Sequence, residues 1–216
     1  MSRIVILGAG IAGHTVARYL NKWLGKGHEI VVVSPNAKWN WIPSNIWVGV
    51  GQMTEDDVTF DLARVYKRIG VDFRQARGIS IHPEGDAGSP APYVTIEYTL
   101  AGKAGQQDRV GYDYLVNATG PKLNFGATPG LGPEAGHTVS VCTVSHALHA
   151  SEKLQEQIQA MRGGARRTFV VGTGHGMCTC QGAAFEYIYN VDHILREKGV
   201  RDKARIVWLS NEYELG

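Results

Sequence analysis

The residues of this sequence best suited to redox chemistry are cysteines, and two of the three share one short loop. Cys178 and Cys180 follow an apolar stretch at residues 168–171 and a run of glycines, at the point where a helix is expected to begin. The unpaired N–H groups at a helix N-terminus favour the thiolate form of a cysteine placed there. The loop therefore indicates sulfur redox chemistry. A metal site that includes His175 is an alternative, but it lacks four well-spaced ligands, and we predict no metal.

A glycine pattern near the N-terminus predicts a dinucleotide site. Gly8, Gly10 and Gly13 follow an apolar strand at residues 3–7 and open a helix, and a second strand completes a βαβ unit. The first glycine permits the tight turn, the second lets a pyrophosphate approach the backbone, and the third lets the helix pack on the strand. The position that usually holds an acidic residue for the ribose is Ser34, which can still form a hydrogen bond, although a weaker one.

A second strand–glycine–helix segment departs from this pattern. Counted from Gly172 and Gly174, the third glycine would be residue 177, and that position holds Met177. The cysteines also occupy the exit from this turn. We therefore expect the second turn not to bind NAD(P)H.

Apolar periodicity places these motifs in an α/β fold. Short apolar strands alternate with amphipathic helices, which indicates a parallel sheet covered on both faces. The first helix is expected to bury one stripe, which consists of Val16, Ala17, Leu20, Trp23 and Leu24. The other expected elements are strands at 29–34, 71–76, 112–117 and 204–210, helices across 62–69 and 145–161, and an antiparallel meander across 79–111.

Glycines and prolines in residues 124–136 predict a domain boundary. Residues 1–125 are expected to form a dinucleotide-binding Rossmann-like domain, and residues 136–216 a second Rossmann-like domain that carries the cysteine pair. The predicted fold class is therefore α/β, with two tandem three-layer Rossmann-like domains. The first contains the antiparallel meander and is incomplete.

The composition argues against several classes of partner. Lys and Arg number 22 against 20 for Asp and Glu, a near balance that argues against nucleic acid. Three cysteines in 216 residues do not make a disulfide framework. The apolar opening at residues 4–7 breaks at a glycine and predicts a buried strand rather than a signal sequence. We expect a protein that begins at Met1 and stays in the cell interior.

Longer strings of residues narrow the function. They are Pro43-Ser44-Asn45-x-Trp47-Val48-Gly49-x-Gly51, Asp113-Tyr114-Leu115-Val116-x-Ala118-Thr119-Gly120-Pro121, Val141-Cys142-Thr143-Val144-x-His146-Ala147 and Cys180-x-Gly182-x-Ala184-Phe185-Glu186-Tyr187. With the first glycine turn, and in this order, they resemble the sulfide:quinone oxidoreductases. These are flavoproteins of the glutathione-reductase type, which oxidise hydrogen sulfide at one face of FAD and reduce a membrane quinone at the other.

The resemblance implies an FAD site and a sulfur-carrying cysteine. Cys180 matches the family cysteine that lies beside the flavin and carries sulfur as a persulfide, and Cys142 matches a further, less essential cysteine. Cys178 has no counterpart in the family pattern and is either an alternative partner for Cys180 or incidental. The residues implied to hold FAD are Gly8, Gly10, Ala12, Gly13, Ser34 near the ribose, Pro43, Ser44 and Asn45 along the flavin, and Ala118, Thr119 and Gly120.

The resemblance also implies partners. These are hydrogen sulfide, a quinone and a peripheral contact with the inner face of the cell membrane. The chain stops at Gly216, before the family's second working cysteine, quinone pocket and membrane-binding helices, so the match is to the first half only. A free-standing fragment would be cytoplasmic. The flavoprotein subunit of a flavocytochrome c sulfide dehydrogenase and a non-catalytic FAD-binding module are the alternatives, and homo-oligomer formation is left open.

Other side chains allow two interpretations. Cys142 could be a small buried apolar residue. Glu186 could relay protons or be a solvated helix carboxylate. His14 is expected to pack rather than catalyse, and His146 and His149 are expected to be surface or capping residues.

Overall fold

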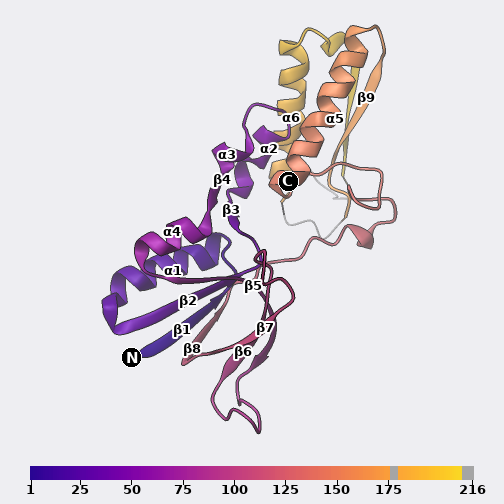
Figure 1. Cartoon of the computed structure of the whole chain (residues 1–216). Coiled ribbons are helices and arrows are strands. Elements are labelled where there is room, and N and C mark those ends of the chain that lie inside the picture. The colour runs from indigo at the N-terminus through magenta and orange to yellow at the C-terminus, as the bar shows by residue number, and fades with distance from the viewer. Residues whose placement is uncertain (176–179, 211–216) are drawn as a thin grey trace. The chain divides into compact units, whose positions relative to one another are not determined.

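The computed structural model describes residues 1–175 and 180–210 and leaves residues 176–179 and 211–216 outside the description. The chain forms two compact units, drawn in Figure 1. The first unit consists of residues 1–39 and 59–122, and the second unit of residues 40–58 and 123–216.

The first unit is built on one mixed sheet. Its strand order is β7-β6-β5-β2-β1-β8, with β5, β2, β1 and β8 parallel and the β5–β6–β7 part antiparallel. The elements are β1 (Ser2–Leu7), α1 (Ile11–Leu24), β2 (His28–Ser34), α4 (Leu62–Ile69), β5 (Asp72–His82), β6 (Tyr93–Tyr98), β7 (Gln107–Gly111) and β8 (Tyr114–Asn117). Two short strands, β3 (Lys38–Asn40) and β4 (Thr59–Asp61), pair with each other.

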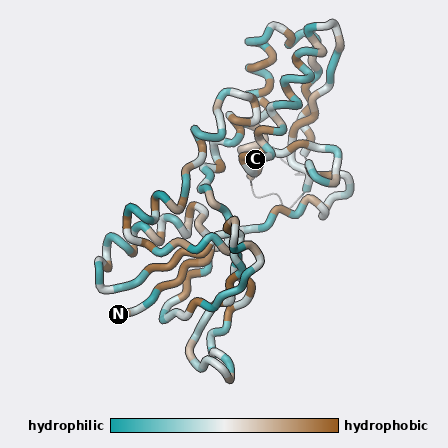
Figure 2. Tube along the Cα trace, viewed as in Figure 1, coloured by the Kyte–Doolittle hydropathy of each residue, from teal (hydrophilic) through white to brown (hydrophobic). Residues whose placement is uncertain are grey.

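The two faces of this sheet are covered differently. Alternate residues of β1 and β2, such as Ile6 and Val32, pack with side chains of α1 and α4. The intervening residues, such as Val5 and Val31, pack against the antiparallel strands instead. Figure 2 shows hydrophobic residues concentrated along these strands. The sheet is therefore covered on both faces, as the apolar runs predict, but helices supply only one of the covers.

Two local predictions in this unit are wrong. Trp23 does not lie on the buried stripe of α1, because it is 70% exposed; its ring centroid lies 5.0 Å from that of Tyr19. Leu24 is also exposed, at 37%. The buried residues of α1 are Gly13, His14 and Ala17, with Val16 and Leu20 packed against the same core, so the buried stripe stops before the last turn of the helix. The expected strand at 71–76 and the first meander strand are one continuous strand, β5, which pairs with β2 and then with β6 and changes register after Gly78.

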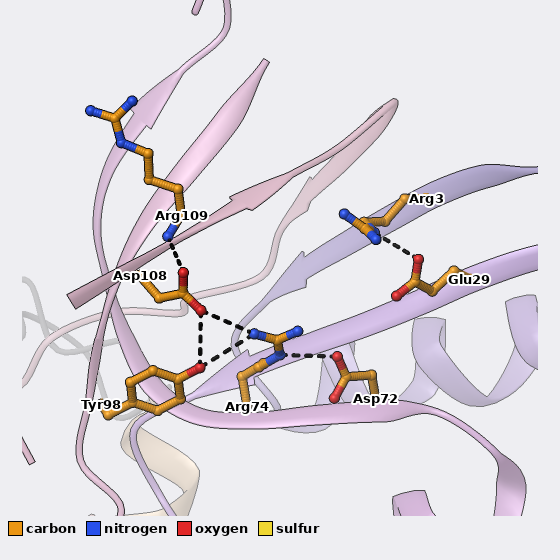
Figure 3. A network of polar contacts seen from close by, with 7 residues as sticks. All are labelled: Arg3, Glu29, Asp72, Arg74, Tyr98, Asp108 and Arg109. Atoms are coloured by element: carbon orange, nitrogen blue, oxygen red, sulfur yellow. Dashed lines mark hydrogen bonds and ion pairs between the residues drawn. The ribbon is translucent and has the colours of Figure 1, made fainter. Parts of the chain in front are cut away.

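A polar network links the outer strands of the sheet (Figure 3). Arg74 on β5 donates to Asp72 at 2.9 Å and to Tyr98 on β6 and Asp108 on β7, each at 3.3 Å. These side chains are at least partly exposed, so each ion pair contributes at most about 1 kcal/mol. The network matters more for strand register than for stability, because its partners sit on three neighbouring strands.

The second unit pairs two helices with a short parallel sheet. Leu154 and Ile158 of α5 and Ile194 and Leu195 of α6 form its buried core. The elements are α2 (Asn45–Val48), α3 (Glu55–Val58), α5 (Val144–Arg162), β9 (Arg167–Gly172), α6 (Gln181–Glu197) and β10 (Ala204–Leu209), with single 3₁₀ turns at Ile42–Ser44, Phe125–Ala127 and Arg201–Lys203. A further 3₁₀ turn in the first unit is Gly25–Gly27.

Residues 40–58 belong by contact to the second unit, although the sequence places them inside the predicted domain 1–125. Val48 and Val58 are buried beside Ala147 of α5, and Val50 joins the core between α5 and α6. These apolar side chains cover helix faces of the second unit, which a linear reading of the chain does not reveal. The assignment of residues 1–125 and 136–216 to separate functional domains stays a prediction.

Candidate cofactor and sulfur sites

The first glycine turn is held closed by backbone contacts that only glycine permits. Gly8 has φ +94°, and its N–H donates to the carbonyl of Val33 at 2.8 Å. A Cβ on Gly8 would lie 2.2 Å from the carbonyl oxygen of Ala118, and a Cβ on Gly13 would lie 2.0 Å from the carbonyl oxygen of Gly8. Both positions therefore require glycine, for the turn and for helix packing, as the pattern predicts.

Gly10 differs because a Cβ there would meet no atom within 4 Å. Gly10 is the N-cap of the 14-residue helix α1, whose first turn carries no acidic residue. Gly10 and Ala12 are exposed, so the unpaired N–H groups of this helix end face open space. An open, positively polarised backbone of this kind fits the pyrophosphate of a dinucleotide.

The turn after β8 lies against this glycine turn. The N–H of Ala118 donates to the carbonyl of Leu7 at 2.8 Å, and the Thr119 hydroxyl donates to Asn117 Oδ1 at 2.9 Å. Gly120 then takes the left-handed conformation, with φ +70°. The structure thus brings together the predicted residues of the first glycine turn and of the Ala-Thr-Gly turn.

Ser34 and His14 lie beside the turn with covered side chains. Ser34 ends β2 and is 4% exposed, so its predicted ribose contact would require the hydroxyl to be uncovered. His14 is 9% exposed and shares a 3.1 Å hydrogen bond with the Tyr66 hydroxyl. Burial, and then the charge of Arg18, lower the pKa of His14. His14 is therefore a packed, neutral histidine, as expected.

In the second unit, Asn45 serves a structural purpose. Its side chain is fully buried and exchanges two hydrogen bonds with the Asn40 side chain, at 2.9 and 3.1 Å. Asn40 also donates to the carbonyl of Val58 at 3.3 Å, which ties both ends of the 40–58 segment together. Pro43 is exposed and Ser44 is half-buried. The placement of these residues along a flavin stays a prediction.

Three of the residue strings named above, those that contain Gly49, Val141 and Tyr187, meet in this unit. The Tyr187 hydroxyl donates to the carbonyl of Gly49 at 3.2 Å, and burial raises the pKa of Tyr187 to about 12. A Cβ on Gly49 would lie 2.9 Å from the Tyr187 ring and 2.7 Å from Val141. The glycine therefore allows α2 to pack directly on α6, the helix that begins next to Cys180.

Both described cysteines are free and exposed. Cys180 is the N-cap of the 17-residue helix α6, as predicted, and Cys142 precedes the Thr143 cap of α5. The alternative that Cys142 is a buried apolar residue is therefore wrong. Glu186 is exposed, which favours a solvated carboxylate. Cys178 lies outside the described residues.

The side chain of His146 is less exposed and makes more contacts than the sequence predicts. Its side chain is 17% exposed, and its Nε2 lies 2.8 Å from a Glu134 carboxylate oxygen. Its Nδ1 is buried with no partner among the described residues. The sequence predicts a surface or capping histidine: the backbone N–H of His146 does donate to the Thr143 cap at 3.2 Å, but its ring is covered by residues of the 124–138 loop, including Phe125. Only the string around Cys142 could have drawn attention to it.

The described part of the chain offers neither a metal-binding cluster nor a membrane-spanning helix. Residues 1–175 and 180–210 contain no group of three or more His, Cys, Asp and Glu side chains that could hold a metal ion. No helix in these ranges is long and apolar enough to cross a bilayer.

Comparison with known proteins identifies the family to which this chain belongs. The family described as pyridine nucleotide-disulphide oxidoreductase matches residues 2–204. A sulfide-quinone reductase of Aquifex aeolicus (strain VF5) is 31% identical over 213 residues, which are 99% of this chain and 44% of that protein. A mitochondrial sulfide:quinone oxidoreductase of Dictyostelium discoideum is 30% identical over 207 residues, 95% of this chain and 41% of that protein. The chain therefore spans less than half the length of these relatives, and the predicted resemblance is confirmed.

Solved structures agree on the fold. The sulfide:quinone oxidoreductase of the hyperthermophilic bacterium Aquifex aeolicus matches with a TM-score of 0.80 at 26% identity, over 100% of this chain and 44% of that one. NDH2 of Plasmodium falciparum in complex with NADH matches with a TM-score of 0.67 at 16% identity, over 96% of this chain and 41% of that one. The predicted α/β fold class is confirmed.

Proposed function

Since the chain belongs to the pyridine nucleotide-disulphide oxidoreductase family, we propose that the protein oxidises hydrogen sulfide with FAD and passes the electrons to a membrane quinone. The observation that carries this proposal is Cys180, a free, exposed thiol at the start of α6. It lies in a chain that is about 30% identical to two sulfide:quinone enzymes.

The first unit would hold the cofactor. Members of the family are FAD-binding flavoproteins, so FAD is the group expected at the first glycine turn. Gly8 and Gly13 keep the turn tight, and the open face at Gly10 would receive the pyrophosphate. Bound FAD supplies a two-electron acceptor.

Cys180 would carry the sulfur. The thiolate is the reactive form of a cysteine in thiol–disulfide exchange. If Cys180 is joined to a second cysteine, HS⁻ attacks the Cys180 sulfur, a persulfide S–S bond forms, the original S–S bond breaks, and the partner leaves as a thiolate. In this step the disulfide is the two-electron oxidant of the sulfide sulfur, and the two electrons that the cysteines gain are those that a bound FAD would accept.

The partner of Cys180 in this exchange is a cysteine outside the described residues, either Cys178 or one in a longer chain. Cys142 is assigned a secondary role, because it lies before α5 rather than at α6 and matches the less essential family cysteine.

Anaerobic reduction of the flavin by sulfide tests this proposal with two matched variants. Cys180→Ser should retain bound flavin. The rate at which sulfide bleaches this flavin should fall by about 100-fold or more, as expected when a nucleophile is removed. Cys142→Ser should reduce the rate less. Unchanged bleaching in Cys180→Ser would refute the role of Cys180.

The acceptor is a separate part of the proposal. A soluble quinone analogue should reoxidise the sulfide-reduced protein faster than cytochrome c does. The reverse order would favour a flavocytochrome-type partner. Binding to lipid vesicles, measured by co-sedimentation, would test the peripheral membrane contact that a membrane quinone requires.

A further inference from the structure

The second glycine turn has a geometry unlike that of the first. Gly172 is the last residue of β9 rather than the first residue after it, and neither Gly172 nor Gly174 has a positive φ. The strand pairing continues one residue further, because Thr173 N–H donates to the carbonyl of Leu209 at 3.1 Å. Of the glycines of this turn that the structure describes, Gly172 and Gly174, neither makes the left-handed turn that Gly8 makes, although the family name implies a pyridine nucleotide.

The space over this turn is filled by a neighbouring loop of the same unit. A Cβ on Gly174 would lie 2.7 and 2.9 Å from the two methyl carbons of Leu131, so these methyls lie against its α-carbon. The Thr128 hydroxyl donates to the carbonyl of Gly174 at 3.0 Å, which fastens the loop to the turn. The position that a Cβ would take is empty at Gly10. At Gly174 the same position is occupied by the apolar side chain of Leu131.

We propose that Leu131, anchored through Thr128, fills the phosphate position of the second turn and is the residue that excludes NAD(P)H. The second glycine of a dinucleotide turn must leave room for the pyrophosphate. Leu131 removes that room, and a phosphate pressed against its methyls would lose hydration without gaining a hydrogen bond. The residues described here do not fit a pyridine nucleotide, and this inference holds whether or not sulfide is the electron donor.

Direct binding of NADH tests the proposal without relying on activity. Calorimetric titration of the purified protein should show no saturable binding up to about 1 mM, the upper end of ordinary KM values. A Thr128→Ala/Leu131→Ala double variant removes both contacts and should bind NADH at least about tenfold more tightly, as expected when a pocket gains room for its ligand. Leu123→Ala, a 42% exposed leucine of the same unit, is the matched control and should behave as the wild type.

Two results would overturn the proposal. One is saturable NADH binding by the wild type, which requires no variant to fold. The other is a folded double variant, verified by circular dichroism, that binds NADH no better than Leu123→Ala. If the double variant does not fold, Leu131→Val, which shortens the side chain by one carbon, replaces it under the same criterion. Failure of sulfide to bleach the flavin would leave these outcomes untouched, so the two proposals fail separately.

Discussion

The two glycine turns share the same Gly-x-Gly spacing in the sequence, but the surfaces that they present in the structure differ. At Gly8 to Gly13 the strand stops, the chain turns through a positive φ, and the backbone of α1 is open at Gly10. At the second turn the strand includes the first glycine, Gly172, and Leu131 lies against Gly174. A glycine pattern therefore predicts a turn between strand and helix, but the segment packed over the second glycine decides whether a dinucleotide can bind.

The glycines of the two turns also differ in what a Cβ would meet. At Gly8 and Gly13 it would meet backbone atoms, and at Gly172 it would lie 1.7 Å from the carbonyl oxygen of Leu209. Gly174 faces the end of a flexible leucine side chain, which can move. Because the glycines differ in what a Cβ would contact, the expected effects of replacing each with alanine can be ranked.

Among Gly13→Ala, Gly10→Ala and Gly174→Ala, the largest effect is expected for Gly13→Ala. Its Cβ would lie 2.0 Å from the carbonyl oxygen of Gly8, so α1 must move away from β1. The change should lower the free energy of unfolding by about 2–3 kcal/mol, even after the roughly 1 kcal/mol that alanine gains in a helix. Urea unfolding measures this loss.

Gly10→Ala is the control for that variant. Its Cβ meets no atom, so its unfolding free energy should stay within about 1 kcal/mol of the wild type while flavin retention falls. A Gly13→Ala protein as stable as Gly10→Ala would contradict the tight contact of Gly13 with the Gly8 carbonyl.

A smaller effect is expected for Gly174→Ala, about 1 kcal/mol, because the Leu131 methyls can shift. In a Leu131→Ala background the same change should have no effect, since the contact is already gone. A double-mutant cycle in urea measures this coupling. Additive effects would mean that Leu131 does not lie on Gly174.

The smallest effect is a dependence on pH that belongs to the first unit. The pKa of His14 is lower in the folded protein than in the unfolded chain. Below about pH 6.5 the unfolded chain therefore binds a proton at His14 more readily than the folded protein does. The free energy of unfolding should therefore fall as the pH drops below that value. His14→Gln should flatten this slope, and the exposed His137→Gln should keep it. Equal slopes in all three proteins would show that His14 does not titrate as described.

Much of the fold could be predicted from local patterns. Periodic apolar runs predicted α4, α5 and the parallel strands, and the glycine spacing predicted the close contact of Gly13 with Gly8. Features that depend on distant packing could not be predicted. The burial of Asn45 against Asn40 and the attachment of residues 40–58 to α5 and α6 arise from contacts between segments far apart in the chain.

The candidate site shows the same division. The sequence predicts Cys180 at a helix start, and the resemblance assigns both the first glycine turn and Ala118 to the cofactor, but their direct contact is seen only in the structure. Residues 124–136 are predicted only as a boundary, because glycine and proline content says nothing about where Leu131 points. Trp23 is predicted on the buried stripe, but the stripe stops before the last turn of α1.

The most direct test of the account is the visible spectrum of the purified protein, recorded anaerobically with sulfide and NADH added to separate samples. With a flavin at the first turn, sulfur chemistry at Cys180 and a filled second turn, sulfide should bleach the flavin band and NADH should not. A flavin bleached by NADH and untouched by sulfide would contradict both assignments.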